Sequence, residues 1–170
     1  MTVVDKNELR KRMRQVRAEV DDRLFRSVDL WRQVAELPGY RAASTVMAFK
    51  GFGSEPDTDP LFARIAADGK RLLLPRVDGD DIVVVDGNGP MERSRIGVEE
   101  PTGPALPIEL VEFVIVPGLA FTLDGFRLGW WQDARSSIAP PDGERNKDAD
   151  GVRRAGHAMP PWCEERSFRG

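Results

Sequence analysis

The strongest constraint on the fold is a short segment, Glu112 to Pro117, in which every residue between the two ends is apolar. Such a run predicts a strand at the centre of a sheet that is covered on both faces. Ser44 to Phe49 also predicts a buried strand, because it is rich in β-branched and large apolar residues. Arg71 to Pro75 and Asp81 to Asp86 are two further strand candidates, so the chain can build a sheet of several strands.

Apolar residues recur at helical spacing in three segments, residues 5–20, 22–37 and 59–68. The second helix is expected to end at Pro38-Gly39 and to turn one face inward; that face comprises Leu24, Val28, Trp31 and Val34. Two helices therefore precede the first strand, and a third follows it. This order predicts an α/β fold: a three-layer domain with a mostly parallel central sheet, helices on both faces and two helices at the N-terminus.

The pattern changes after Gly129. Residues 1–129 are predicted to form the α/β domain, whereas residues 130–170 hold neither a helical nor a strand period for ten residues. We expect this atypical tail to be irregular.

Bulk properties exclude several classes of protein. The 170-residue chain has a formal net charge of −3, which disfavours a nucleic-acid binder. No run approaches the roughly 18 apolar residues of a membrane span. Cys163 and His157 are the only residues of their kinds, too few for a typical structural zinc site. We expect a cytoplasmic protein and favour a monomer.

Three segments are candidates for chemistry. The first is the basic helix near the N-terminus, where one face carries Lys6, Arg10, Arg14 and Arg17. Such a row can hold the phosphates of a nucleotide. The alternative interpretation is a solvated helix face.

The second candidate is the loop Lys50 to Asp59, which follows a buried strand and would lie at the carboxyl edge of the sheet. Glu55 is suited to accept hydrogen bonds from the ring amide and amine groups of a substrate, although a surface role is equally compatible. Asp57 or Thr58 is expected to cap the next helix.

The third candidate is the segment Val116 to Gly129, in which a core strand leads to an arginine flanked by glycines. A buried guanidinium at Arg127 would need an anionic partner such as phosphate. The alternative is that Asp124-Gly125 is only a hairpin turn and Arg127 an edge residue.

Together these segments resemble the 5-formyltetrahydrofolate cyclo-ligase family. The resemblance rests on motifs in the family's order, namely Lys6-x-x-Leu9-Arg10, Gly53-Ser-Glu-Pro-Asp-Thr-Asp-Pro-Leu61, Gly69-Lys70 with Leu74-Pro75-Arg76, Gly97-Val-Glu-Glu-Pro101, Val114-Ile-Val-Pro-Gly-Leu-Ala-Phe121 and Gly125-Phe-Arg-Leu-Gly129.

The resemblance implies an ATP- and Mg²⁺-dependent cyclisation of 5-formyltetrahydrofolate to 5,10-methenyltetrahydrofolate, with release of ADP and phosphate. It implies that Lys6, Arg10, Arg127 and Gly129 contact ATP, with Arg127 also acting in catalysis, and that Glu55 binds the folate. It assigns no metal ligand, because Asp133 is out of register with the family's aspartate.

The sequence departs from the family after Gly129. The family continues into a glycine-rich turn that ends in Tyr-Tyr-Asp or Phe-Tyr-Asp, whereas this chain continues with Trp130, Trp131, Gln132 and Asp133. A shifted reading frame or a divergent gene copy would explain the break. A second hypothesis is therefore a catalytically impaired member of the family that binds nucleotide or folate without turnover.

Overall fold

The structure is a computed structural model that describes residues 5–79, 81–94, 97–122 and 127–129. Its helices are α1 (Lys6–Ala18), α2 (Arg23–Glu36), α3 (Pro38–Ala42), α4 (Asp59–Ala67) and the 3₁₀ helix η1 (Ile108–Leu110). Its strands are β1 (Thr45–Met47), β2 (Arg71–Asp78), β3 (Asp81–Asp86), β4 (Met91–Arg93), β5 (Glu99–Pro101), β6 (Phe113–Val114), β7 (Ala120–Phe121) and β8 (Arg127–Leu128).

The central sheet has the strand order β3-β2-β1-β6. Strand β1 runs parallel to both β2 and β6, with Val46 opposite Leu72 and Phe113, whereas β3 is antiparallel to β2. The hairpins β4-β5 and β7-β8 form two smaller sheets. The mostly parallel arrangement confirms the predicted α/β class.

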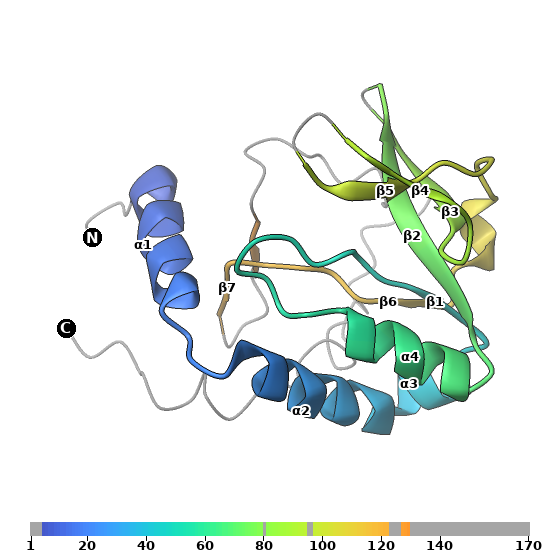
Figure 1. Ribbon diagram of the computed structural model, residues 1–170, viewed down its shortest axis with the longest axis horizontal. Coiled ribbons are helices and arrows are strands. Elements are labelled where there is room, and N and C mark those ends of the chain that lie inside the picture. Colours follow the sequence, from blue (N-terminus) through green and yellow to red (C-terminus); the bar gives the residue numbers. More distant parts are fainter. Residues whose placement is uncertain (1–4, 80, 95–96, 123–126, 130–170) are drawn as a thin grey trace, which may run out of the picture.

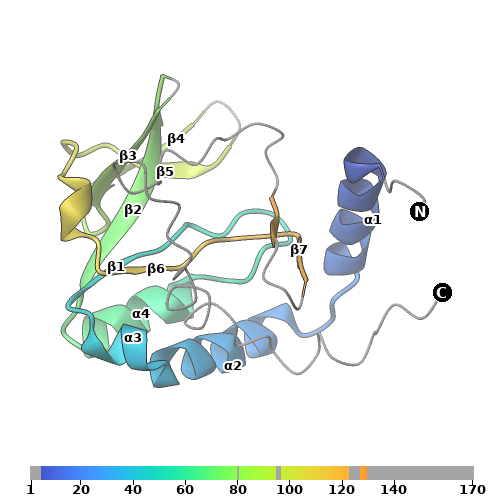
Figure 2. The same ribbon diagram turned by 180° about the vertical axis from the view of Figure 1, so that it is seen from behind.

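The core lies on both faces of this sheet because alternate residues of a strand point to opposite sides. On one face, Val46 and Leu72 pack against α2, Tyr40 of α3 and α4. On the other face, Met47 and Leu73 pack with Val84 against the segment that contains Leu106 and Val111. Figures 1 and 2 show α2, α3 and α4 together on the first face. In the described part of the chain, the second face carries the 3₁₀ helix η1 and its flanking segment.

Helix α1 stands apart from this core (Figures 1 and 2) and none of its residues is buried. Its predicted start is confirmed, because the Asp5 carboxylate accepts a hydrogen bond from the backbone N–H of Asn7 at 3.0 Å. The helix is not long and apolar enough to cross a membrane, nor is any other helix in the described ranges.

Two local predictions about the second helix were incomplete or wrong. Pro38 ends α2 but also begins α3, where its fixed φ suits the first position of a helix. Of the predicted inward face, Trp31 is buried and Val34 packs against the core, whereas Leu24 and Val28 are exposed. The other buried residues of α2 are Ser27 and Ala35. A polar Ser27 occupies the buried position because it bonds to a backbone group of a neighbouring loop.

We predict that Leu73→Ala lowers the free energy of unfolding by about 2–5 kcal/mol, because Leu73 is 0% exposed in the centre of β2 and the substitution leaves a cavity. The control on the same strand is Val77→Ala, at a side chain 57% exposed, and we expect a change within about 0.5 kcal/mol. Urea denaturation measures both. Equal losses would contradict the placement of Leu73 in the core.

Candidate functional site

The candidate site lies where β1 and β6 end. Because these strands are parallel, the segments that follow them emerge at the same edge of the sheet. Figure 1 shows both segments running towards α1, and Figure 2 shows the same arrangement from behind. The loop between β1 and α4 and the hairpin β7-β8 are thereby brought close to the N-terminal helix.

The loop after β1 is folded on itself around Glu55. The Phe52 N–H donates to Oε2 of Glu55 at 3.1 Å, and the Glu55 N–H donates to the Phe52 carbonyl at 3.1 Å. The Gly51 N–H donates to Oγ1 of the buried Thr58 at 3.0 Å. A Cβ at Gly51 would lie 2.4 Å from the carbonyl oxygen of Pro56, so this turn requires glycine. The loop therefore presents Glu55 in a fixed conformation.

Helix α2 fixes the end of this loop through two buried side chains that the sequence analysis did not single out for this role. Oγ of Ser27 accepts a hydrogen bond from the Asp57 N–H at 2.9 Å and donates to the Arg23 carbonyl at 2.7 Å. The indole N–H of Trp31 donates to the Asp57 carbonyl at 2.6 Å. The sequence offered one sign of this contact: Ser27 lies one helical turn before Trp31, on the same face of α2.

The expected cap of α4 is confirmed in part, because the Asp57 carboxylate accepts a hydrogen bond from the Asp59 N–H.

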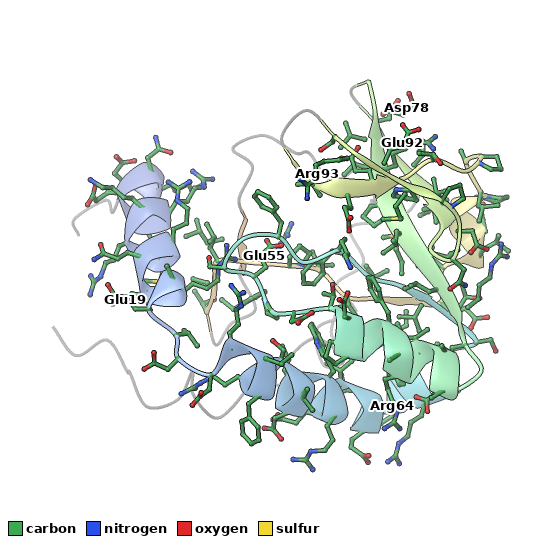
Figure 3. The ribbon with its side chains drawn as sticks, viewed as in Figure 1. Glu19, Glu55, Arg64, Asp78, Glu92 and Arg93 are labelled. Carbon is green, nitrogen blue, oxygen red and sulfur yellow. The ribbon has the colours of Figure 1, made fainter. Side chains whose placement is uncertain are left out.

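The side chains of Glu55 and Arg17 lie side by side, and both are shielded from most of the solvent. Nη1 of Arg17 lies 3.8 Å from Oε1 of Glu55, and the two side chains are 15% and 16% exposed. Nε of Arg17 donates to Oγ of Ser54 at 3.0 Å. Burial raises the pKa of Glu55, while the Phe52 N–H and the charge of Arg17 oppose that rise. Burial likewise lowers the pKa of Arg17. Figure 3 shows Glu55 between α1 and the sheet.

Arg10, Arg127 and Gly129 lie together near the other end of α1. Nε of Arg10 donates to the carbonyl of Gly129 at 3.1 Å, which links residues 119 positions apart in the chain. Nη1 of Arg127 donates to the carbonyl of Pro117 at 2.8 Å. Lys6 lies one helical turn before Arg10 and is exposed. The structure thus brings Arg10 to Gly129 and leaves Glu55 near the far end of the helix.

Arg127 corrects one expectation, because it is exposed rather than buried. As the alternative interpretation held, it lies on a strand of a small antiparallel hairpin; the turn predicted at Asp124-Gly125 lies outside the described residues. Among the described residues, neither Arg10 nor Arg127 forms an ion pair with a carboxylate, since their partners there are carbonyl and amide oxygens. Two guanidinium groups that have no acidic partner within the described ranges favour an anion at this edge.

The described ranges contain no group of three or more His, Cys, Asp or Glu that could hold a metal ion. Asp133, His157 and Cys163 lie outside these ranges, as do Trp130, Trp131 and the tail that we expect to be irregular.

A cavity of about 230 Å³ lies away from this site, lined by residues of α2, α3, α4 and the turn between α4 and β2. Its cations already have partners: Arg64 pairs with Asp68 at 2.8 Å, and Lys70 donates to the Ala43 carbonyl. Figure 3 shows Arg64 on the far part of the molecule from α1. The edge near α1 is therefore the better candidate, because Arg10 and Arg127 have no acidic partner in the part of the chain that the structure describes.

Comparison with known proteins places these features in a family context. The sequence model of the 5-formyltetrahydrofolate cyclo-ligase family matches residues 2–132, and this match ends three residues past Gly129. The NMR structure of 5,10-methenyltetrahydrofolate synthetase from Aquifex aeolicus is similar with a TM-score of 0.67 and 30% identity, over 76% of this chain and 69% of that one.

A 5,10-methenyltetrahydrofolate synthetase from Mycoplasma pneumoniae is similar with a TM-score of 0.56 and 21% identity, over 75% of this chain and 72% of that one. At that identity the likeness concerns the fold alone. A search of curated proteins gave no significant match.

We predict that the Glu55 carboxyl titrates above its ordinary pKa of 4.5 in the folded protein, because burial disfavours the charged form. A carboxyl whose pKa is raised by folding binds its proton more tightly in the native state, so its contribution to stability falls as pH rises through 4.5 and up to the folded pKa. Carbon-13 NMR of the carboxyl measures the titration. A midpoint at or below 4.5 would contradict the burial of Glu55.

Proposed function

The chain belongs to the 5-formyltetrahydrofolate cyclo-ligase family, a family of enzymes, and from this premise we propose that it converts 5-formyltetrahydrofolate to 5,10-methenyltetrahydrofolate with cleavage of ATP to ADP and phosphate. The observation that carries the proposal is the placement of Glu55 and of the Arg10–Gly129 contact along the same helix, at the edge where β1 and β6 end.

In the proposed reaction, the formyl oxygen of the folate takes the γ-phosphoryl group of ATP, and ADP leaves. The N10 nitrogen then attacks the activated formyl carbon and loses its proton, and the bond from carbon to the phosphorylated oxygen breaks. The original formyl oxygen departs in inorganic phosphate. Catalysis of this kind depends on positioning and on neutralising phosphate charge.

Glu55 is proposed to bind the folate. A carboxylate accepts hydrogen bonds from two neighbouring N–H groups, which matches the ring amide and amine of a pterin. Oε2 is already oriented by the Phe52 N–H, so the carboxylate would meet the ring in a fixed direction. Fixing this direction before binding reduces the entropy lost when the ligand is ordered.

Lys6, Arg10, Arg127 and the backbone at Gly129 are proposed to bind ATP, with Arg127 also stabilising charge on the transferred group. Their side chains fit phosphate because the described part of the chain gives the two arginines no acidic partner. Magnesium would accompany the nucleotide, held mainly by phosphate oxygens and water. Its ligands from this protein stay unassigned.

The second candidate function is a module that binds nucleotide or folate without turnover. The observation that favours it is the sequence after Gly129, where Trp130 and Trp131 stand in place of a glycine-rich phosphate turn.

We predict that purified protein mixed with 5-formyltetrahydrofolate, ATP and Mg²⁺ gives the absorbance rise of methenyltetrahydrofolate, and that omission of ATP abolishes the rise. Isothermal titration with each ligand accompanies the assay. Binding of both ligands without a rise in absorbance would reject the enzyme in favour of the binding module. If neither ligand binds, both candidate functions are rejected.

We predict that Arg10→Gln raises the Michaelis constant or dissociation constant for ATP by about tenfold to 100-fold, the effect expected from losing a charged hydrogen-bond donor. Lys11→Gln is the control, since Lys11 is the next residue of α1, is exposed and carries the same charge. We expect it to alter ATP binding less than about threefold. Equal effects would mean that overall charge, rather than the Arg10 side chain, attracts the nucleotide.

A further inference from the structure

Helix α1 is attached to the protein by polar side chains near its two ends. Among the described residues, the two hydrophobic core clusters contain no residue of α1. Arg10 donates to Gly129 near the start of the helix, and Arg17 donates to Ser54 near its end. The Arg17 side chain is only 15% exposed, which is unusual for an arginine on such a helix.

The Arg17 guanidinium meets the loop after β1 at two places. Its Nε donates to Oγ of Ser54 at 3.0 Å, while its Nη1 approaches Oε1 of Glu55 to 3.8 Å. The other oxygen of the carboxylate, Oε2, accepts from the Phe52 N–H at 3.1 Å. The two oxygens of Glu55 thus have different partners, and rotation of the carboxylate would break the contact with at least one of them.

We propose that Arg17 is a positioning residue for Glu55: it holds the carboxylate in the orientation in which Glu55 meets the pterin ring. This inference rests on the proposed folate-binding role of Glu55. Arg17 would act on the ligand through Glu55, because its own contacts are with Ser54 and Glu55 of the loop.

Arginine suits this position better than lysine because its planar fork donates in two fixed directions. Nε serves the Ser54 hydroxyl and Nη1 faces the Glu55 carboxylate, whereas a lysine ammonium offers one point charge. Among the described residues, other charges nearby belong to Arg14, whose charge acts on Arg17, and to Arg23. Arg17 is the cation that forms an ion pair with Glu55 in this part of the chain.

Arg23 provides a matched comparison. Its Nη1 donates to the carbonyl of Gly53 at 2.6 Å, so it also attaches α2 to the same loop. It has no ion pair with Glu55 in the described structure. Arg23→Gln therefore removes a positive charge and a loop contact, while Arg17→Gln additionally removes the partner of the carboxylate.

The first test titrates 5-formyltetrahydrofolate and ATP separately into the unsubstituted protein, Arg17→Gln, Arg17→Lys and Arg23→Gln. We expect Arg17→Gln to weaken folate binding about tenfold or more and ATP binding less than about twofold, with partial recovery in Arg17→Lys. Arg23→Gln should change folate binding less than about threefold. Equal folate affinities in Arg17→Gln and the unsubstituted protein, or equal losses in Arg17→Gln and Arg23→Gln, would overturn the proposal.

A second test uses no ligand, so it separates this inference from the proposed function. Hydrogen exchange of the Phe52 amide reports whether Oε2 of Glu55 stays in place. We expect the Phe52 amide to exchange several-fold faster in Arg17→Gln than in Arg23→Gln, with both variants showing the far-ultraviolet circular dichroism of the unsubstituted protein. Unchanged exchange in Arg17→Gln overturns the positioning role. Failure of the unsubstituted protein to bind folate overturns the proposed function, and with it the role of Arg17 towards a ligand.

Discussion

Strand β1 hydrogen-bonds to β2 on one side and to β6 on the other, and the position of the candidate site depends on this double pairing. The Ala48 N–H donates to the Leu73 carbonyl at 3.0 Å, and the Ile115 N–H donates to the Met47 carbonyl at 2.8 Å. The second bond holds β6 in register with β1, although more than sixty residues separate the two strands in the sequence. The parallel direction then places the Glu55 loop and the Pro117 turn at one edge.

Burial of Glu55 is costly, and the surrounding structure offsets that cost in several ways. The Phe52 N–H satisfies one oxygen and Arg17 lies near the other. Burial also lowers the pKa of Arg17, so the pair depends on a loop conformation that keeps the two groups 3.8 Å apart. That conformation comes from Gly51, which allows the close approach of Pro56, and from Ser27. Because burying this carboxylate costs free energy of folding, its presence in the loop favours a role in ligand binding over a role in stability.

The sequence predicted the elements whose apolar pattern is local, and missed those that depend on distant partners. The starts of β1, β2, β3 and α4 agree with the predicted segments to within a residue, because their buried residues follow strand or helix periods. The apolar run after Glu112 gives only a short strand, β6, at an edge of the described sheet. The burial of Ser27 depends on a loop thirty residues away, to which its hydroxyl is hydrogen-bonded. The partner of Arg17 could not be identified from helical spacing, which indicated only a basic face.

Helix α1 acts as a spacer between the two proposed ligand sites. Arg10 and Arg17 are seven residues apart, so a rise of 1.5 Å per residue separates their Cα atoms by about 10 Å along the axis. Among the described residues, the buried core contains no residue of α1, and the helix contacts the rest of the protein through Arg10 and Arg17. A phosphate bound at Arg10 would add a contact at one end, and a folate bound by Glu55 would strengthen the other. Because both contacts are already present in the described structure, the two proposed sites have this separation before either ligand binds. Through these two contacts a single helix relates the two proposed sites, and their separation is set by the length of helix between Arg10 and Arg17.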